Sequence, residues 1–209
     1  MVSPQDDCNE VEVLLGEAAS LIENRLYNEA LLTLQRGLSM DPDNPKAWER
    51  IAVCNLEMGK PKKAIEALNN LVRIQPNSQS GWADKALIHL LLNETAEGIG
   101  ALQKSVRLNP RRVRDWELLS SVLVSEERWD EAVEAIEITL DQNPNSAITW
   151  YNLALCYLFF EEYSLAIQTV ETAFTLDPSL REIADEWIDL IDEDGISEEY
   201  SAASGFAAS

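Results

Sequence analysis

The sequence has few basic side chains and no long apolar run. Its 16 Lys and Arg residues stand against 37 Asp and Glu, so the formal net charge is -21. Nucleic acids and anionic membranes both attract basic surfaces, so this charge predicts that the chain binds neither. No run approaches the roughly 18 apolar residues of a membrane span, and the first residues lack the pattern of a signal peptide. We therefore expect a soluble protein, with the cytoplasm as its compartment.

Cysteine and histidine are also scarce, which limits the chemistry available. Cys8, Cys54 and Cys156 are odd in number and far apart, which favours a reducing compartment over a disulfide framework. The spacings of a zinc site are absent. The single histidine, His89, has no acidic residue four positions away and is expected to pack in a core. The sequence thus predicts no enzyme, no cofactor and no metal.

The sequence does contain a short motif that repeats every 34 residues. Prolines stand at 42, 76, 110, 144 and 178, and tryptophans stand six residues after the first four of them. A fixed period of this length is typical of repeat proteins, in which stacked units complete one another's cores. With each proline at position 32, the five units are 11–44, 45–78, 79–112, 113–146 and 147–180.

Within one unit, the apolar residues follow helical spacing with a break about every dozen residues, so each unit predicts a pair of helices. Position 8 and position 20 are small in every unit, which allows two helices to approach closely. Position 24 is always bulky and apolar, and the proline at position 32 ends the second helix. The small residues are Ala18, Ala52, Ala86, Ser120 and Ala154 in one column, and Ala30, Ala64, Gly98, Ala132 and Ala166 in the other.

These columns resemble the tetratricopeptide repeat family over about residues 11 to 180. The last unit carries the pattern most fully, with Trp150, Leu153, Ala154 and Tyr157 in the stretch TWYNLALCY. The resemblance implies an all-α, right-handed α-solenoid of five helix pairs. It also implies a concave groove, lined by the first helices, that holds a peptide or a helix of a partner protein.

The flanks of the repeats are expected to differ. Residues 1–10 are predicted to be a flexible N-terminus, and a helix over 180–192 is predicted to cap the last repeat, so that the repeat domain spans 11–192. Residues 193–209 are acidic and lack periodicity, which predicts a disordered tail. Whether this tail docks in the groove stays open at the level of the sequence.

Helical geometry indicates which residues face the groove. Positions 2, 5, 9, 12 and 13 lie opposite the buried side of each first helix. They are most apolar in the third and fifth units, and packing between adjacent first helices is the alternative interpretation for positions 9 and 12. The predicted partner-binding groove consists of Leu56, Leu87, Leu90, Leu91, Val124, Tyr151, Leu155, Leu158 and Phe159.

Charge is unevenly distributed along the chain. Residues 45–112 carry a net charge of +5, whereas residues 113–209 carry -19. The basic side chains near two turns form a predicted secondary basic patch. Three roles are open for this patch: it could bind an acidic partner, it could contact the chain's own tail or a second copy, or it could be solvated surface without a partner. The patch consists of Lys60, Lys62, Lys63, Arg107, Arg111, Arg112 and Arg114.

The predicted function is that of a non-catalytic adaptor or scaffold. Its groove would bind an amphipathic helix or an apolar peptide segment of a protein partner. Two alternatives remain: a dedicated chaperone or assembly factor that shields a client, and a regulatory subunit of an enzyme complex. Self-association is a further alternative, and the sequence does not identify the partner.

Overall fold

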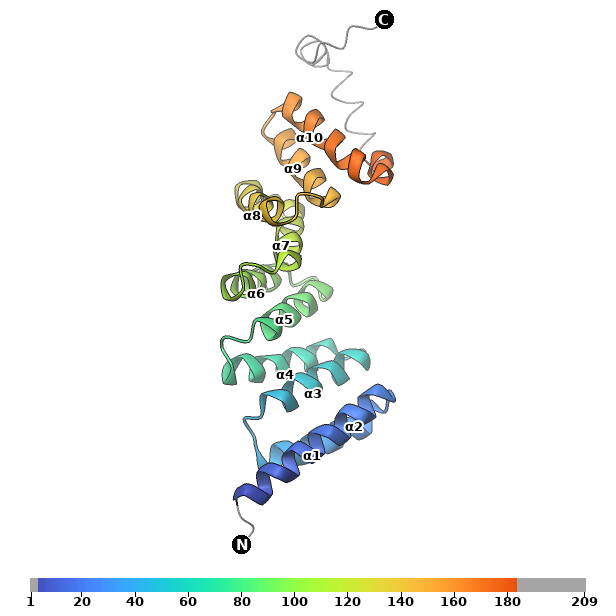
Figure 1. Ribbon diagram of the computed structural model, residues 1–209, viewed down its shortest axis with the longest axis vertical. Helices are drawn as coiled ribbons and strands as arrows, with labels where there is room; N and C mark the ends of the chain where they lie inside the picture. Colours follow the sequence, from blue (N-terminus) through green and yellow to red (C-terminus); the bar gives the residue numbers. More distant parts are fainter. Residues whose placement is uncertain (1–3, 184–209) are drawn as a thin grey trace, which may run out of the picture. The chain divides into compact units, whose positions relative to one another are not determined.

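The computed structural model describes residues 4–183, with side chains from residue 9 onward. The chain divides into two compact units, Met1–Asn109 and Pro110–Ser209. Throughout the described part, the regular elements are helices (Figure 1). The division falls inside the single repeat domain that the period predicts.

In the first unit, three helix pairs follow one another. Each odd-numbered helix packs against the even-numbered helix that follows it, and each even-numbered helix packs against the next first helix. The elements are α1 (Pro4–Glu23), α2 (Tyr27–Met40), α3 (Pro45–Glu57), α4 (Pro61–Ile74), α5 (Gln79–Leu91) and α6 (Thr95–Leu108).

The second unit holds two further pairs and a short 3₁₀ turn. Helices α7 and α9 also contact each other, as first helices of neighbouring repeats. The elements are α7 (Val113–Ser125), α8 (Trp129–Gln142), α9 (Ala147–Phe159), α10 (Tyr163–Leu176) and η1 (Pro178–Leu180). The described residues therefore contain the five predicted helix pairs in the predicted phase.

The N-terminal boundary differs from the prediction. Helix α1 begins at Pro4, so residues 4–10, which were predicted to belong to a flexible N-terminus, are helical. Proline has no N–H to leave unpaired and its fixed φ suits the first helical turn, so Pro4 favours a start at this point. The repeat period could not show this extension because it lies upstream of the first full unit.

The predicted capping helix is only partly covered by the structure. Pro178–Leu180 form the 3₁₀ turn, in which Asp177 accepts hydrogen bonds from the backbone N–H and the hydroxyl of Ser179. Residues 181–183 are helical, and Leu180 is buried against the core of the last helix pair. The rest of the predicted helix, 184–192, and the predicted tail, 193–209, lie outside the described residues.

The columns predicted to build the core are buried. At positions 8 and 20, the Ala and Ser residues are at most 4% exposed and Gly98 is buried, which confirms that the two helices of each pair approach there. At position 24, the bulky residues are at most 1% exposed. These are Leu34, Leu68, Leu102, Ile136 and Val170.

The recurring proline and tryptophan are joined by a hydrogen bond. The indole Nε1–H of Trp48 donates to the carbonyl oxygen of Pro42 over 2.9 Å, and that of Trp150 donates to Pro144 over 2.8 Å. The same bond links position 32 to the following position 4 at the two other copies. The proline–tryptophan motif therefore recurs because this hydrogen bond fixes the turn that leads into the first helix of the next repeat. Arguments from packing alone did not predict the hydrogen bond.

Candidate partner-binding groove

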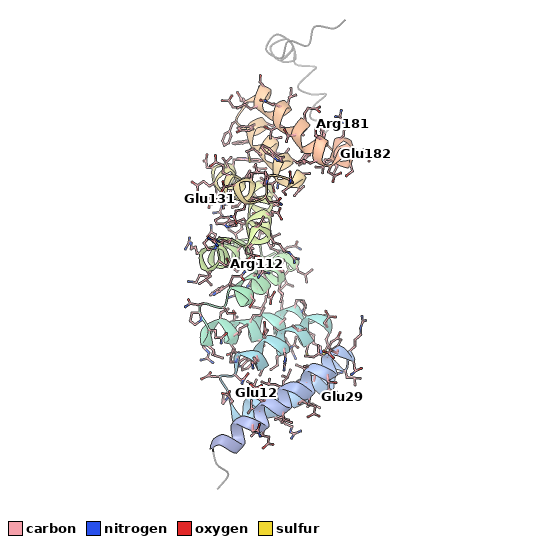
Figure 2. All side chains as sticks on the ribbon, viewed as in Figure 1. Glu12, Glu29, Arg112, Glu131, Arg181 and Glu182 are labelled. Carbon is pink, nitrogen blue, oxygen red and sulfur yellow. The ribbon has the colours of Figure 1, made fainter. Side chains whose placement is uncertain are left out.

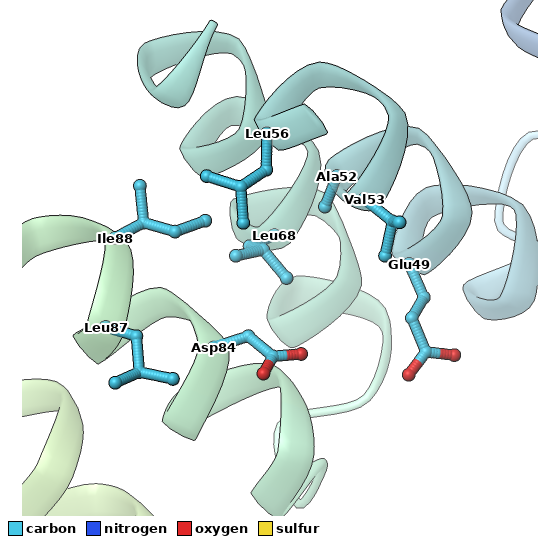
Figure 3. Close-up of a pocket in the computed structure, with 8 residues that line it drawn as sticks. All are labelled: Glu49, Ala52, Val53, Leu56, Leu68, Asp84, Leu87 and Ile88. Atoms are coloured by element: carbon cyan, nitrogen blue, oxygen red, sulfur yellow. The ribbon is translucent and has the colours of Figure 1, made fainter. Parts of the chain in front are cut away.

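An open apolar pocket lies in the first unit between α3 and α5, with α4 behind it (Figure 3). Its volume is about 140 Å³. Its lining consists of Glu49, Ala52, Val53, Leu56, Leu68, Asp84, Leu87 and Ile88.

Helical spacing explains how these residues meet. On α3, Glu49, Val53 and Leu56 are three or four residues apart and so share one face of the helix. Val53 is 41% exposed and Leu56 is 38% exposed, while Leu87 on the facing helix α5 is 44% exposed. Leu68 on α4 is 1% exposed and closes the floor. The pocket thus has a buried apolar floor and exposed apolar side chains at its mouth.

Two carboxylates stand at one end of the pocket. Glu49 projects from α3 and Asp84 from α5, and both lie away from the end formed by Leu56 and Ile88 (Figure 3). A segment lying in this pocket would therefore meet an apolar surface along most of its length and negative charge at one end.

In the first unit, the predicted groove residues lie in different surroundings. Leu56 and Leu87 line the pocket. Leu91 is 65% exposed but lies outside the pocket lining. Leu90 packs into its own helix pair, because a Cβ placed on Gly98 of α6 would lie only 2.7 Å from its Cδ2 atom. Leu90 thus fills the space that an alanine side chain occupies in the other repeats, and its placement in an open groove is corrected.

In the second unit, the prediction of an exposed apolar strip is wrong at two positions. Val124 is 8% exposed and Tyr151 is 9% exposed. Tyr151 belongs to a core that includes Phe174 and Leu180, so the chain that follows α10 closes over it. Leu155 packs against this same core, and Leu158 is half-buried.

Phe159 is the exception in that unit. It is 54% exposed, but its ring stacks on Trp129 from α8, with 4.7 Å between the ring centroids. It therefore belongs to a separate aromatic cluster.

The predicted secondary basic patch is divided between the two units. Lys60, Lys62, Lys63 and Arg107 are exposed on the first unit. The other members lie on the second unit, where Arg112 approaches the 4% exposed Asp115 with 3.3 Å between Nε and Oδ1. Arg112 thus neutralises a buried carboxylate at the start of α7, which is a structural role.

A different kind of ion pair lies at the surface. Lys46 donates to Glu12 on α1 over 3.1 Å, and both side chains are more than half exposed. Glu12 is labelled in Figure 2. Exposed pairs of this kind contribute little to stability.

The reactive side chains are held in structural settings. Burial raises the pKa of the Cys54 thiol, and it raises the pKa of Cys156 to about 11. His89 is 8% exposed, and its Nδ1 lies 2.7 Å from Oε2 of Glu94, five residues on. Burial lowers the pKa of Lys85, whose ammonium group lies over the ring of Trp82, 5.2 Å from the centroid.

Within the described residues, no group of three or more His, Cys, Asp or Glu side chains is placed to hold a metal ion. Between residues 4 and 183, no helix combines the length and the apolar character needed to cross a membrane.

Comparisons with known proteins agree with this architecture. Family models described as tetratricopeptide repeat match residues 21–88 and residues 117–180. No curated protein sequence matches the chain.

Several solved structures share the fold. A crystal structure of MamA aligns with a TM-score of 0.72 at 20% identity, covering 83% of this chain and 94% of that chain. MamA from Desulfovibrio magneticus RS-1, from its residue 41 onward, aligns with a TM-score of 0.69 at 15% identity, covering 81% and 96%. YrrB, described as a TPR protein with an unusual peptide-binding site, aligns with a TM-score of 0.71 at 19% identity, covering 79% and 85%.

The two family matches together span more than half of the sequence, and the solved structures share the predicted right-handed α-solenoid fold. Tetratricopeptide repeats are in general protein-interaction modules without catalysis of their own. The chain belongs to the tetratricopeptide repeat family.

Proposed function

We propose that this protein is a non-catalytic adaptor that holds an amphipathic helix or an extended apolar segment of a partner protein in the pocket between α3 and α5. The observation that carries the proposal is the apolar floor between these two first helices, left open with Val53, Leu56 and Leu87 exposed at its mouth. Exposed apolar surface gathered in one place on a protein marks an interaction site. The description of YrrB as having a peptide-binding site supports the use of this fold for peptides.

The size of the pocket indicates how a partner would be anchored. An apolar cavity of about 150 Å³ accepts a benzene-sized group, so this pocket of about 140 Å³ suits one large apolar side chain. If about 400 Å² of apolar surface were covered on each side, the gross gain would be roughly 20 kcal/mol at about 25 cal/mol per Å². Ordering and association remove most of this gain, so we expect micromolar affinity.

The test compares three forms of the full chain in affinity capture from the source cell extract. These are the unaltered chain, the pocket variant Val53→Glu/Leu87→Glu, and the control Leu165→Glu. Leu165 lies outside the pocket on α10 and is 41% exposed, close to the 44% of Leu87. A captured partner is then mapped to a segment, and the segment is titrated against all three forms by calorimetry.

The expected result is a segment that binds the unaltered chain and the control alike and binds the pocket variant at least tenfold more weakly, since each glutamate would place a charge in the apolar contact. Equal binding to all three forms would overturn the proposal. Circular dichroism confirms that the variants keep their helices.

The same complex separates the two alternative roles. A client that aggregates without a stoichiometric amount of this protein would identify a chaperone or assembly factor. Catalytic activity found only in the purified complex would identify a regulatory subunit of an enzyme.

A further inference from the structure

Three aromatic side chains meet at one edge of the second unit. Trp129 opens α8, Phe159 ends α9 and Phe160 follows it. Trp129 and Phe159 stack with 4.7 Å between ring centroids and 19° between planes, and Phe160 meets Phe159 edge-on at 5.5 Å. We call these three residues the aromatic shelf. It joins the turns of two successive repeats, 30 residues apart in the sequence.

The aromatic shelf does not serve to fill the core. Phe159 is 54% exposed and Phe160 is 40% exposed, whereas Phe174 of the same unit is 4% exposed within its core. Large aromatic side chains gathered at a surface are typical of contacts with other molecules. Their stacking holds the rings in place before any partner arrives, which lowers the entropy cost of binding.

Acidic residues flank the aromatic shelf in the two turns that carry it. The turn before Trp129 contains two exposed carboxylates, and the turn after Phe160 contains two more. These residues are Glu126, Glu127, Glu161 and Glu162. The basic residue of the first turn, Arg128, is held by Glu131, with its Nε and Nη2 atoms both donating to that carboxylate over 2.5 to 2.8 Å. Glu131 lies on α8 (Figure 2).

This combination selects a cation with a flat apolar face. The faces of aromatic rings attract cations, and guanidinium both stacks on rings and donates paired hydrogen bonds to carboxylates. Lysine offers a point charge without the planar stacking. An acidic or nucleic-acid partner would be repelled by the four carboxylates.

We propose that the aromatic shelf is a second docking surface, which binds an arginine-bearing segment of a partner protein. The guanidinium group stacks on an exposed phenylalanine ring and donates hydrogen bonds to the neighbouring glutamates. The occupant follows from charge complementarity and from the geometry of the rings. This site lies in the other unit from the pocket between α3 and α5 and uses different chemistry, so it stands whether or not that pocket binds a segment.

The test uses a fluorescein-labelled peptide of 12 residues in which arginine and alanine alternate. The matched probe replaces every arginine with citrulline, which keeps the shape of the side chain and removes its charge. Fluorescence anisotropy of each probe is titrated with the full chain at about 50 mM and about 300 mM salt, where screening differs strongly.

Two variants of the aromatic shelf and one control are compared. Phe159→Ser/Phe160→Ser removes the exposed rings, and Glu126→Gln/Glu162→Gln removes two charges at residues whose backbone φ is negative, so the turn geometry is kept. The control Glu134→Gln/Glu137→Gln removes the same charge from exposed positions of α8 away from the turns.

We expect the arginine peptide to bind about tenfold more tightly than the citrulline peptide at the lower salt. The phenylalanine variant should weaken binding about tenfold, the Glu126/Glu162 variant about fivefold, and the control less than twofold. Thermal melts followed by circular dichroism check the fold. If removing the rings unfolds the unit, the two glutamine pairs, which leave the rings intact, decide the question.

Three results would overturn the proposal. Equal binding of the citrulline peptide would remove the role of the cation, and equal weakening by both glutamine pairs would reduce the effect to overall acidity. Absence of peptide binding together with self-association that depends on Phe159, measured by sedimentation, would make this surface a contact between copies of the chain.

Discussion

Each repeat ends its first helix with a residue in the left-handed region, at repeat position 15. These residues have φ between 56° and 68°, and they are Arg25, Gly59, Asn93, Glu127 and Glu161. In every turn, the next backbone N–H donates to the carbonyl five residues earlier, as from Leu26 to Leu21 over 2.8 Å and from Glu162 to Tyr157 over 2.9 Å. This is the Schellman ending of a helix, in which glycine is the favoured residue at the left-handed position. Among the five repeats, only the second has a glycine at this position, Gly59.

We predict that replacing Glu127 and Glu161 with glycine stabilises the second unit. A residue with a Cβ pays roughly 1–2 kcal/mol in this conformation, and glycine loses about 0.5–1 kcal/mol more chain entropy on folding. The net gain is about 0.5–1 kcal/mol per site. Removing a carboxylate from the negative end of the helix dipole adds about 0.3 kcal/mol at each site. The double variant should therefore raise the free energy of unfolding by about 1.5–2.5 kcal/mol and the Tm by about 3–10 °C.

The assay is urea unfolding followed by far-ultraviolet circular dichroism, with the midpoint and slope fitted for each variant. The matched control is Glu127→Ala/Glu161→Ala, which removes the same charges and keeps the Cβ atoms. Gly59→Ala should lower the free energy of unfolding by about 1 kcal/mol or more, and Asn93→Gly should raise it less than a glutamate replacement does, since asparagine tolerates this region. The reasoning fails if the alanine pair stabilises as much as the glycine pair, or if Gly59→Ala is neutral.

Three further predictions concern single contacts. Trp150→Phe keeps a ring but removes the indole bond to the Pro144 carbonyl, so urea unfolding should show a loss of about 1 kcal/mol, and an unchanged midpoint would contradict this. Burial raises the pKa of Cys156 to about 11 from an ordinary value of 9.0, so its stabilising effect is complete below pH 9 and is lost as pH rises from 9 through 11. Cys156→Ala should flatten this pH dependence in thermal melts, and a persisting slope of the same size would assign it to other groups. Gly98→Ala adds a better helix former but places its Cβ 2.7 Å from Leu90 Cδ2, so we expect a net loss of about 1–2 kcal/mol that shrinks when Leu90→Ala is added. A double-variant cycle without coupling would refute that contact.

The helix pairs were predictable because their signals recur in five copies. A single alanine says little, but small residues in phase at positions 8 and 20 can only mark a repeated close approach of helices. Ala154 and Ala166 are both completely buried, as the columns require. Cys54 and Cys156 both occupy position 10 of their units, and both are buried.

The binding surface was less predictable, because a groove depends on contacts that do not recur. Leu87 and Leu90 are both leucines on one helix, yet one lines the pocket and the other fills the space beside Gly98. The signal was present in the sequence, since Gly98 is the one glycine in a column of alanines. Helical spacing also missed the approach of Glu94 to His89, because the left-handed turn at Asn93 brings residue 94 back toward the helix.

The positions that hold the fold and the positions that form the candidate surfaces are largely separate. Positions 8, 20 and 24 are buried in every repeat, so they cannot change without a cost in packing. The exposed apolar residues of the pocket and of the aromatic shelf stand instead at positions 9, 12, 13 and 14, of which Val53, Leu87, Phe159 and Phe160 are examples. Side chains at these positions differ from repeat to repeat: at position 12, Leu56 lines the pocket, whereas Leu90 fills its own helix pair. A chain built from one repeated unit thus presents an apolar pocket in one unit and an acidic aromatic surface in the other, each carried entirely by residues of its own unit.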